Sequence, residues 1–225
     1  NIHLFPIREV KLEAIDGGDI QYLKEEQIKE PLDEILGESF LSINVSDVSN
    51  RIKSESAFIK DLVVTKNFPK NVIVSVVERL PVLIVQIDQL HCAVLDYEAY
   101  VLEAVEYEED ECAAIKGQYS VPLLFLEDSK VAFNANEQSS FYVVRDIYRM
   151  MLVLSEYGYI PKSMNLDDQI LTITLDGDKE VVFSLNQSVD TQLERLIAVA
   201  SQLKVDDTDF ASLDLRYNRP VLRQK

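Results

Sequence analysis

Apolar residues in the first third of the chain follow two periods, which together predict a small mixed unit. Alternation in FPIREVKLEAI (5–15) predicts a first strand, and helical spacing follows over 22–36. Ser46 is the expected N-cap of a second helix. Runs rich in β-branched residues at 62–66 and 72–77 then predict two strands. This order of elements favours a three-stranded sheet with two helices on one face.

Three prolines interrupt or end the elements predicted for this first unit. Pro31 lies inside the helical pattern, so the helix either kinks there or restarts with Pro31 in its first turn. Pro69 forces Phe68 into an extended conformation and sets up a turn. Pro81 closes the step Glu78-Arg79-Leu80-Pro81 and cannot donate to a strand ladder. We interpret this step as a junction between two modules.

The pattern changes after Pro81 to short strands separated by tight turns. Apolar runs at 82–87, 92–95 and 100–102 predict an antiparallel meander. The acidic stretch EAVEYEEDE (103–111) is typical of a solvated loop. A further apolar run at 121–126 predicts another strand. This part of the chain therefore belongs to a second, mostly antiparallel module.

The last third of the chain alternates helices with strands. Ser139 is the expected cap of a long helix that ends at Gly158. Asp176-Gly177-Asp178 predicts a hairpin between two apolar runs. A final helix is expected from about Asp190, followed by an alternating strand over 213–217. The second module is thus a mixed sheet with helices packed against it.

Charge and composition restrict the classes of function. The 225 residues carry a net charge of −17, with 47% hydrophobic and 27% charged residues. Such an excess of carboxylates argues against nucleic acid and against an anionic membrane surface as partners. No run approaches the roughly 20 apolar residues that a membrane helix needs. The chain begins at Asn1 rather than Met, so we expect a processed product or an excised fragment.

The residues that usually carry chemistry are sparse. Cys92 and Cys112 allow a disulfide but do not require one, and we favour two buried, inert thiols. The two histidines, His3 and His91, are too few for a zinc site and lie in no recognisable nucleophile elbow. No phosphate-binding glycine loop is present, and 206–209 lacks the glycine and glutamate of a calcium loop. We therefore predict no enzyme activity, no metal and no cofactor.

The clearest functional signal is the strand predicted near the C-terminus. If it lies at a sheet edge, its unpaired amides and carbonyls can accept a partner strand. Arg216 and Tyr217 are residue types enriched at binding hot spots. Residue type alone nevertheless favours ordinary surface and core residues of a paired strand, because hot spots are a minority even within interfaces.

Three separated segments resemble one family, the FtsQ/DivIB bacterial cell-division proteins. They are FPIREVKLEAI (5–15), KNFPKNVIVSVVERLPVLIV (66–85) and SLDLRYNRPVLR (212–223). The first unit resembles the POTRA domain of that family, and the ERLP step resembles its exit into the β domain. The resemblance implies an α+β fold with a β-α-α-β-β POTRA domain over 1–81. A mostly antiparallel β domain with packed helices would follow over 82–225.

The same resemblance implies a role as a non-catalytic scaffold of the divisome, anchored by a membrane helix before residue 1. FtsB/DivIC-like and FtsL-like proteins would be its partners, and other divisome components would bind the POTRA domain. In the family the final strand receives a partner strand, and the tyrosine of a DLRY motif belongs to that contact. Carried over, the partner-binding residues are Leu215, Arg216, Tyr217 and Asn218. The chain departs from the family at Asn218-Arg219-Pro220, where small residues and glycine are usual, and around 96–99, where the usual hairpin glycine is missing.

Two alternatives remain at the level of sequence. One is a POTRA-bearing component of a secretion or envelope-assembly machine, which a following β-barrel or repeated POTRA units would indicate. The other is a carboxylate-based envelope hydrolase, which needs two converging acids with separated pKa values. The family resemblance favours the divisome scaffold over both.

Overall fold

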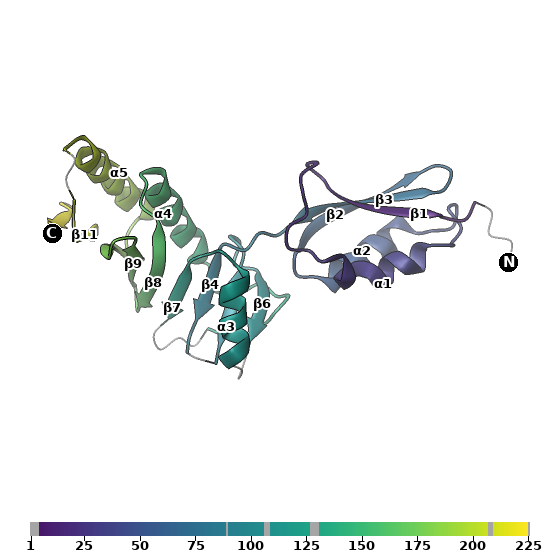
Figure 1. Cartoon of the computed structure of the whole chain (residues 1–225), viewed down its shortest axis with the longest axis horizontal. Helices are drawn as coiled ribbons and strands as arrows, with labels where there is room; N and C mark the ends of the chain where they lie inside the picture. The colour runs from purple at the N-terminus through teal and green to yellow at the C-terminus, as the bar shows by residue number, and fades with distance from the viewer. Residues whose placement is uncertain (1–4, 89, 106–108, 127–130, 207–208, 225) are drawn as a thin grey trace. The chain divides into compact units, whose positions relative to one another are not determined.

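The structure is a computed structural model that describes residues 5–88, 90–105, 109–126, 131–206 and 209–224. The chain forms two compact units, Asn1–Leu80 and Pro81–Lys225 (Figure 1). Each unit has a sheet of its own.

The first unit has the order β-α-α-β-β. Its three-stranded sheet has the order β1-β3-β2, in which β1 is parallel and β2 antiparallel to the central β3. The elements are β1 (Glu9–Ala14), α1 (Glu25–Ile35), α2 (Val45–Glu55), β2 (Ile59–Asn67) and β3 (Asn71–Glu78). This confirms the fold expected for the first unit.

Alternation in the central strand builds the core of this unit. Val72, Val74 and Val76 of β3 are buried, whereas the residues between them are half-buried. Successive side chains of a strand point to opposite faces, so the three valines share the face that the helices cover. The helices contribute a buried stripe of residues, which are Ile28, Leu32 and Ile35 of α1 and Val48 and Ile52 of α2. Both helices therefore pack on one side of the sheet.

The two helices differ in detail from their predicted forms. Helix α1 continues through Pro31 to Ile35, so it does not restart at the proline. The ring of Pro31 is buried, and this burial offsets the hydrogen bond that Pro31 cannot donate. Helix α2 is capped by Asn44, not Ser46: the Asn44 side chain accepts a hydrogen bond from the Ser46 amide at 3.1 Å. The cap was misplaced because serine and asparagine are both favourable there.

Glu78, at the end of β3, fixes the segment that leads into α1. Its carboxylate accepts hydrogen bonds from the amides of Gln21 at 2.9 Å and Tyr22 at 2.6 Å, and also from the Leu23 amide. These three amides lie directly before Lys24, the N-cap residue of α1. Glu78 therefore ties the end of the sheet to the start of the helical layer.

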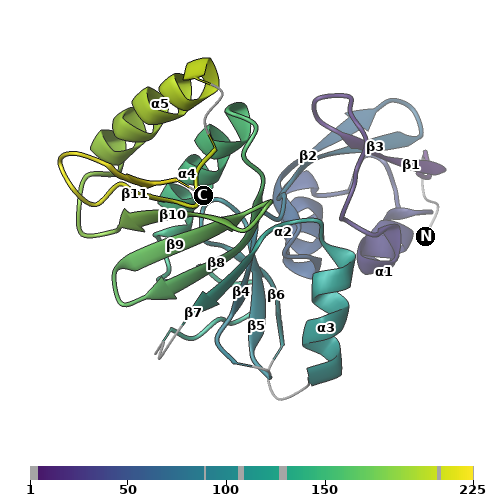
Figure 2. The ribbon, with the colours of Figure 1, turned by 60° about the vertical axis from the view of Figure 1, so that its left-hand side comes forward.

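The second unit contains a nine-stranded mixed sheet with the order β12-β11-β10-β9-β8-β7-β4-β5-β6 (Figure 2). Most neighbours are antiparallel, and the parallel pairs are β4/β7, β7/β8 and β10/β11. The strands are β4 (Leu83–Gln86), β5 (Cys92–Leu95), β6 (Val101–Val105), β7 (Leu123–Leu126), β8 (Pro161–Asp167), β9 (Ile170–Leu175), β10 (Lys179–Ser184), β11 (Ser212–Asp214) and β12 (Val221–Arg223). The helices are α3 (Glu109–Gln118), α4 (Val144–Glu156) and α5 (Val189–Asp206).

The main core lies between the sheet and helices α4 and α5. Buried residues of α4 and α5 join inward residues of β8, β9 and β10 in one cluster, which includes Ile147, Leu154, Leu196, Ile173 and Phe183. The expected start of α4 was too early. Ser139 precedes the helix and its hydroxyl accepts a hydrogen bond from the Phe141 amide, so it stabilises the approach to α4 rather than capping it.

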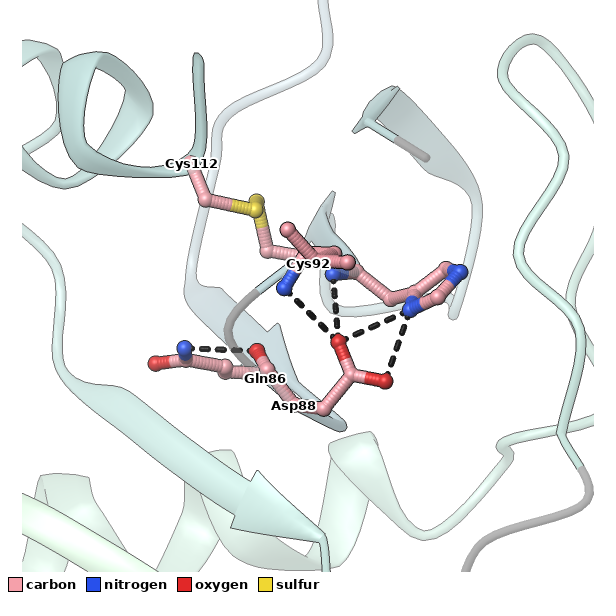
Figure 3. Close-up of polar contacts among 6 residues, drawn as sticks. Gln86, Asp88, Cys92 and Cys112 are labelled. Atoms are coloured by element: carbon pink, nitrogen blue, oxygen red, sulfur yellow. Dashed lines mark hydrogen bonds and ion pairs between the residues drawn. A yellow bond between two sulfur atoms is a disulfide. The ribbon is translucent and has the colours of Figure 1, made fainter. Parts of the chain in front are cut away.

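Cys92 and Cys112 form a disulfide, so the prediction of two free thiols was wrong (Figure 3). Cys92 lies on β5 and Cys112 on α3, a helix that begins at Glu109, near the end of the stretch predicted as an acidic loop. Residues 103–105 belong to β6, and residues 106–108 lie outside the described residues. Ala93 and Leu95 of β5 belong to the main core. By alternation, Cys92 points to the opposite face, which α3 covers.

The strand β4 leads into a turn that brings Cys92 into register. The Asp88 carboxylate accepts hydrogen bonds from the amides of Leu90 at 2.7 Å and His91 at 2.9 Å (Figure 3). It also contacts the His91 ring at 2.8 Å, and this contact is the main cause of the lowered pKa of Asp88. The Gln86 side chain donates to the Asp88 carbonyl at 2.6 Å. The turn is therefore held by its own side chains.

Candidate partner-binding site

The C-terminal segment forms a hairpin at one edge of the nine-stranded sheet. β11 pairs with β10 on one side and with β12 on the other, so β12 is the edge strand. The strand predicted over 213–217 ends earlier, at Asp214. Leu215, Arg216, Tyr217 and Asn218 consequently lie in the connection between β11 and β12, not in a strand.

Asp214 and Arg216 cause the strand to end. The Asp214 carboxylate accepts a hydrogen bond from the Arg216 amide at 3.1 Å, which turns the chain out of the ladder. The Arg216 guanidinium closes on the same carboxylate, with Nε to Oδ1 at 2.9 Å and a terminal nitrogen to Oδ2 at 2.6 Å. The Arg216 side chain is the main cause of the lowered pKa of Asp214, and the same hydrogen bond raises the pKa of Arg216. This bidentate pair makes the turn compact.

Leu215 anchors the connection in the core. It is fully buried, and its amide donates to the Val182 carbonyl of β10 at 2.9 Å. Arg195 of α5 donates to the Leu215 carbonyl at 3.0 Å and to Oδ1 of Asn218 at 3.0 Å. Leu215 and Asn218 therefore position the connection, and Leu215 has no surface to offer a partner.

Tyr217 is the predicted site residue that faces outward. Its side chain is 54% exposed, and the Arg216 guanidinium lies 5.7 Å from the centre of its ring. A guanidinium over a tyrosine ring is a favourable arrangement that limits the freedom of the ring. The amide of the Gln187 side chain donates to the Arg216 carbonyl at 2.7 Å and so holds the preceding residue. The Tyr217 side chain is thus exposed to solvent, while its neighbour Arg216 is held in place.

The edge strand β12 was not predicted from the sequence, and its outer side carries the backbone groups that no described strand pairs with. The Arg223 carbonyl accepts a hydrogen bond from the Ala211 amide at 2.8 Å, so the Arg223 backbone faces β11. Neighbouring residues of a strand direct their N–H and C=O groups to opposite sides, so those of Leu222 face away from the sheet. Pro220 has no N–H to offer. The edge therefore presents one complete donor and acceptor pair, beside the exposed side chain of Val221.

Two groups of residues at this site were not predicted from the sequence. Arg195 and Gln187 reach the connection from around α5, and no local pattern could show that. Val221 and Leu222 form an apolar pair directly after a proline, which is a weak strand signal that could have been read. The strand has three residues, too short for alternation to stand out.

No arrangement typical of catalysis is found in the part of the chain that the structure describes. The described carboxyl groups with shifted pKa values are Glu13, Asp61, Asp88 and Asp214, and each pKa is lowered. A general acid needs a raised pKa instead. Among the same residues, no group of three or more His, Cys, Asp or Glu could hold a metal ion. The hydrolase alternative thus gains no support.

Comparison with known families identifies the first unit. Residues 5–79 match the FtsQ-type POTRA domain, a class of domain that takes part in protein–protein contacts of bacterial cell division. A search of curated proteins returned no match. The β-α-α-β-β fold of the first unit agrees with this match, so residues 5–79 form an FtsQ-type POTRA domain, which supports a protein of the FtsQ/DivIB kind.

The FtsQ-type POTRA domain supports a coarse function in cell division. FtsQ-type POTRA proteins are division-associated scaffolds that are generally not enzymes, and their POTRA domains lie on the extracytoplasmic side. Within the described residues, no helix is long and apolar enough to span a membrane.

Proposed function

We propose that this protein is a non-catalytic scaffold of the divisome that binds FtsB/DivIC-like and FtsL-like partners at the septum by strand addition. Through these contacts it helps to recruit and regulate septal peptidoglycan synthesis. Other divisome components would bind the POTRA unit. A single membrane helix outside this sequence would anchor the protein in the cytoplasmic membrane, with both units on the extracytoplasmic side.

The open edge at β12 carries this proposal. Leu222 directs an N–H and a C=O away from the sheet, and a partner strand can use both groups. Tyr217 and Val221 lie beside that edge and are each 54% exposed. An aromatic residue held next to an open edge is typical of a binding hot spot. The partner would therefore pair with β12 and cover Tyr217.

Leu215, Arg216 and Asn218 would support this contact indirectly. Leu215 ties the connection to the core, and Arg216 closes the turn on Asp214 and lies near the Tyr217 ring. Asn218 is held by Arg195. These residues fix the position of Tyr217, so fewer degrees of freedom are lost on binding.

Two substitutions and a truncation test the proposal, with an FtsB/DivIC-like segment from the same genome as the ligand. Tyr217→Ala should raise the dissociation constant about thirtyfold, because loss of a hot-spot side chain costs about 2 kcal/mol or more. Leu222→Pro removes the outward donor without a loss of ladder hydrogen bonds to β11, and should weaken binding similarly. A chain that ends at Asn218 lacks β12 and should not bind measurably.

Tyr142→Ala is the matched control, because Tyr142 lies in the same unit and is 66% exposed. It should leave the dissociation constant unchanged. If Tyr217→Ala and the truncation at Asn218 both leave binding intact, the proposed site is wrong. Thermal unfolding of each variant separates loss of binding from loss of the fold.

A further inference from the structure

The first unit has an open sheet edge of its own, along β1. The sheet order β1-β3-β2 leaves β1 with a single neighbour. The Ile15 amide donates to the Val76 carbonyl at 2.9 Å, so the backbone of Ile15 faces β3. By alternation, the N–H groups of Val10, Leu12 and Ala14 point away from the sheet. The Ala14 carbonyl is used by the Gly17 amide, which leaves the carbonyls of Val10 and Leu12.

Hollows flank this edge along its length. One groove of about 400 Å³ lies between β1 and α1, with Val10, Leu32 and Leu36 among its lining residues. Leu36 is 45% exposed, although it is a large apolar residue. A second hollow of about 520 Å³ follows Leu12 to Ile15 and the turn around Gly17. An added strand would have apolar surface to cover on the side of the helix.

The charges around the groove indicate the chemistry of its occupant. Glu25, Glu26 and Asp33 of α1 line it, against one cation, Lys29. The second hollow has two carboxylates, Glu13 and Asp19, against one cation, Lys11. The chain as a whole has a net charge of −17. A strand with basic side chains is attracted by this rim, and one with acidic side chains is repelled. A second copy of the chain would bring the same carboxylates against one another, which disfavours self-pairing through β1.

We infer that the β1 edge and the α1 groove form a second binding site, which takes an extended segment of another polypeptide in which aliphatic residues alternate with Lys or Arg. The segment adds a strand to β1 through the backbone of Val10, Leu12 and Ala14. Its aliphatic side chains enter the groove over Leu32 and Leu36, and its cations meet Glu26 and Asp33. This gives the POTRA unit of the proposed scaffold a defined binding edge, but it depends on the groove and not on the C-terminal hairpin.

A ten-residue peptide of alternating valine and lysine is the probe, titrated into the full chain and followed by NMR. Its binding should shift the amides of Val10, Leu12 and Ala14 and slow their hydrogen exchange. The same peptide N-methylated at its four central amides keeps its charge and cannot form a ladder. It should bind more than tenfold more weakly, and a peptide of alternating valine and glutamate should not bind.

Asp33→Lys and Glu30→Lys form a matched pair of protein variants. Both residues are exposed on α1 and both changes reverse one charge, but only Asp33 lines the groove. Asp33→Lys should weaken binding of the valine–lysine peptide about three- to tenfold, because it replaces an attraction by a repulsion. Glu30→Lys should change it less than twofold. The two melting temperatures should agree, which excludes a loss of fold.

Other outcomes overturn the inference. Equal weakening by both variants, or equal binding of the N-methylated peptide, would mean that the peptide is attracted by net charge alone. Protection of the β1 amides that rises with protein concentration, without peptide, would identify a second copy as the occupant. The Tyr217→Ala chain should bind the peptide like the unchanged chain, so a failure at the C-terminal hairpin and a failure here are distinguishable.

Discussion

The two ends of the nine-stranded sheet are built in opposite ways. At the β6 end the start of the edge strand is paired: the Val101 amide donates to the Glu137 carbonyl, the Asn136 amide donates to the Val101 carbonyl, and Tyr100 bridges to Gln138. The Cys92–Cys112 disulfide also fastens α3 to the neighbouring strand β5. At the β12 end, no further described strand follows, and Pro220 and the exposed Val221 mark the edge.

This difference shows how one sheet can pair the backbone at one edge and leave the backbone of the other edge available to a partner strand. An open edge is a hazard because any extended chain can pair with it. At the β6 end, residues 136–138 pair with the backbone of Tyr100 and Val101 at the start of the edge strand. The β12 end is kept short, and Pro220 removes one donor. We expect disruption of the two ends to have separate effects, on stability at β6 and on binding at β12.

The largest effect is expected from the anchor of the open end. Leu215→Ala removes a fully buried side chain from the main core. Such a change costs about 2–5 kcal/mol, from lost burial and the remaining cavity. Urea unfolding should show a free energy of unfolding lowered by that amount. Binding at β12 should weaken because the connection between β11 and β12 loses its anchor in the core. Val205→Ala, at an 80% exposed position of α5, should change stability by less than about 0.5 kcal/mol.

Removal of the disulfide tests the closed end. The bond joins residues separated by 20 positions, and a loop of that length corresponds to about 3 kcal/mol of stabilisation through the unfolded chain. The double variant Cys92→Ala/Cys112→Ala should therefore lower the unfolding free energy by about that amount. Hydrogen exchange should accelerate in β5, β6 and α3. Partner binding at β12 should stay within twofold, and a parallel loss of binding would show that the two ends are coupled.

Much of the fold could be predicted because its signals are local. Alternation in 72–77 and helical spacing around Ile28 and Leu32 are sufficient for the β-α-α-β-β order. The hairpin at Asp176-Gly177-Asp178 followed in the same way from its turn residues. These features depend on residues within one or two turns of each other.

The remaining features depend on residues far apart in the chain. Glu78 binds amides 55–57 positions away, and no spacing rule connects them. The disulfide depends on helix α3, whose first turn overlaps the end of the acidic stretch 103–111 that was predicted to be a loop. The predicted site was shifted because Leu213 to Tyr217 alternates like a strand, whereas the side chain of Asp214 captures the Arg216 amide and ends it. A local hydrogen bond competes with the ladder there, and residue pattern does not decide which one forms.

A smaller effect is expected from the arginine that braces the connection. Arg195→Met keeps the aliphatic stem but removes the hydrogen bonds to the Leu215 carbonyl and the Asn218 side chain. The unfolding free energy should fall by about 1–2 kcal/mol, because each such bond contributes about 0.5–1.5 kcal/mol. Arg145→Met, at an exposed position of α4, is the control and should have little effect. If the two variants are equally stable, Arg195 does not support the site.

The smallest effect, and the most local, is the response of the open end to acid. The Arg216 hydrogen bond holds the pKa of Asp214 below its unfolded value of about 3.9. A carboxyl with a lowered folded pKa contributes stability that is complete above the unfolded value and is lost as the pH falls through the folded one. The NMR chemical shifts of the Arg216 and Tyr217 amides should therefore be constant from pH 7 to about 5 and change only below about pH 4.

Asp214→Asn is the control, because it keeps an acceptor for the Arg216 amide but removes the charge. The connection between β11 and β12 in this variant should be looser at neutral pH and insensitive to acid. A midpoint at or above 3.9 in the unchanged chain would mean that the Asp214–Arg216 pair does not hold the open end in place.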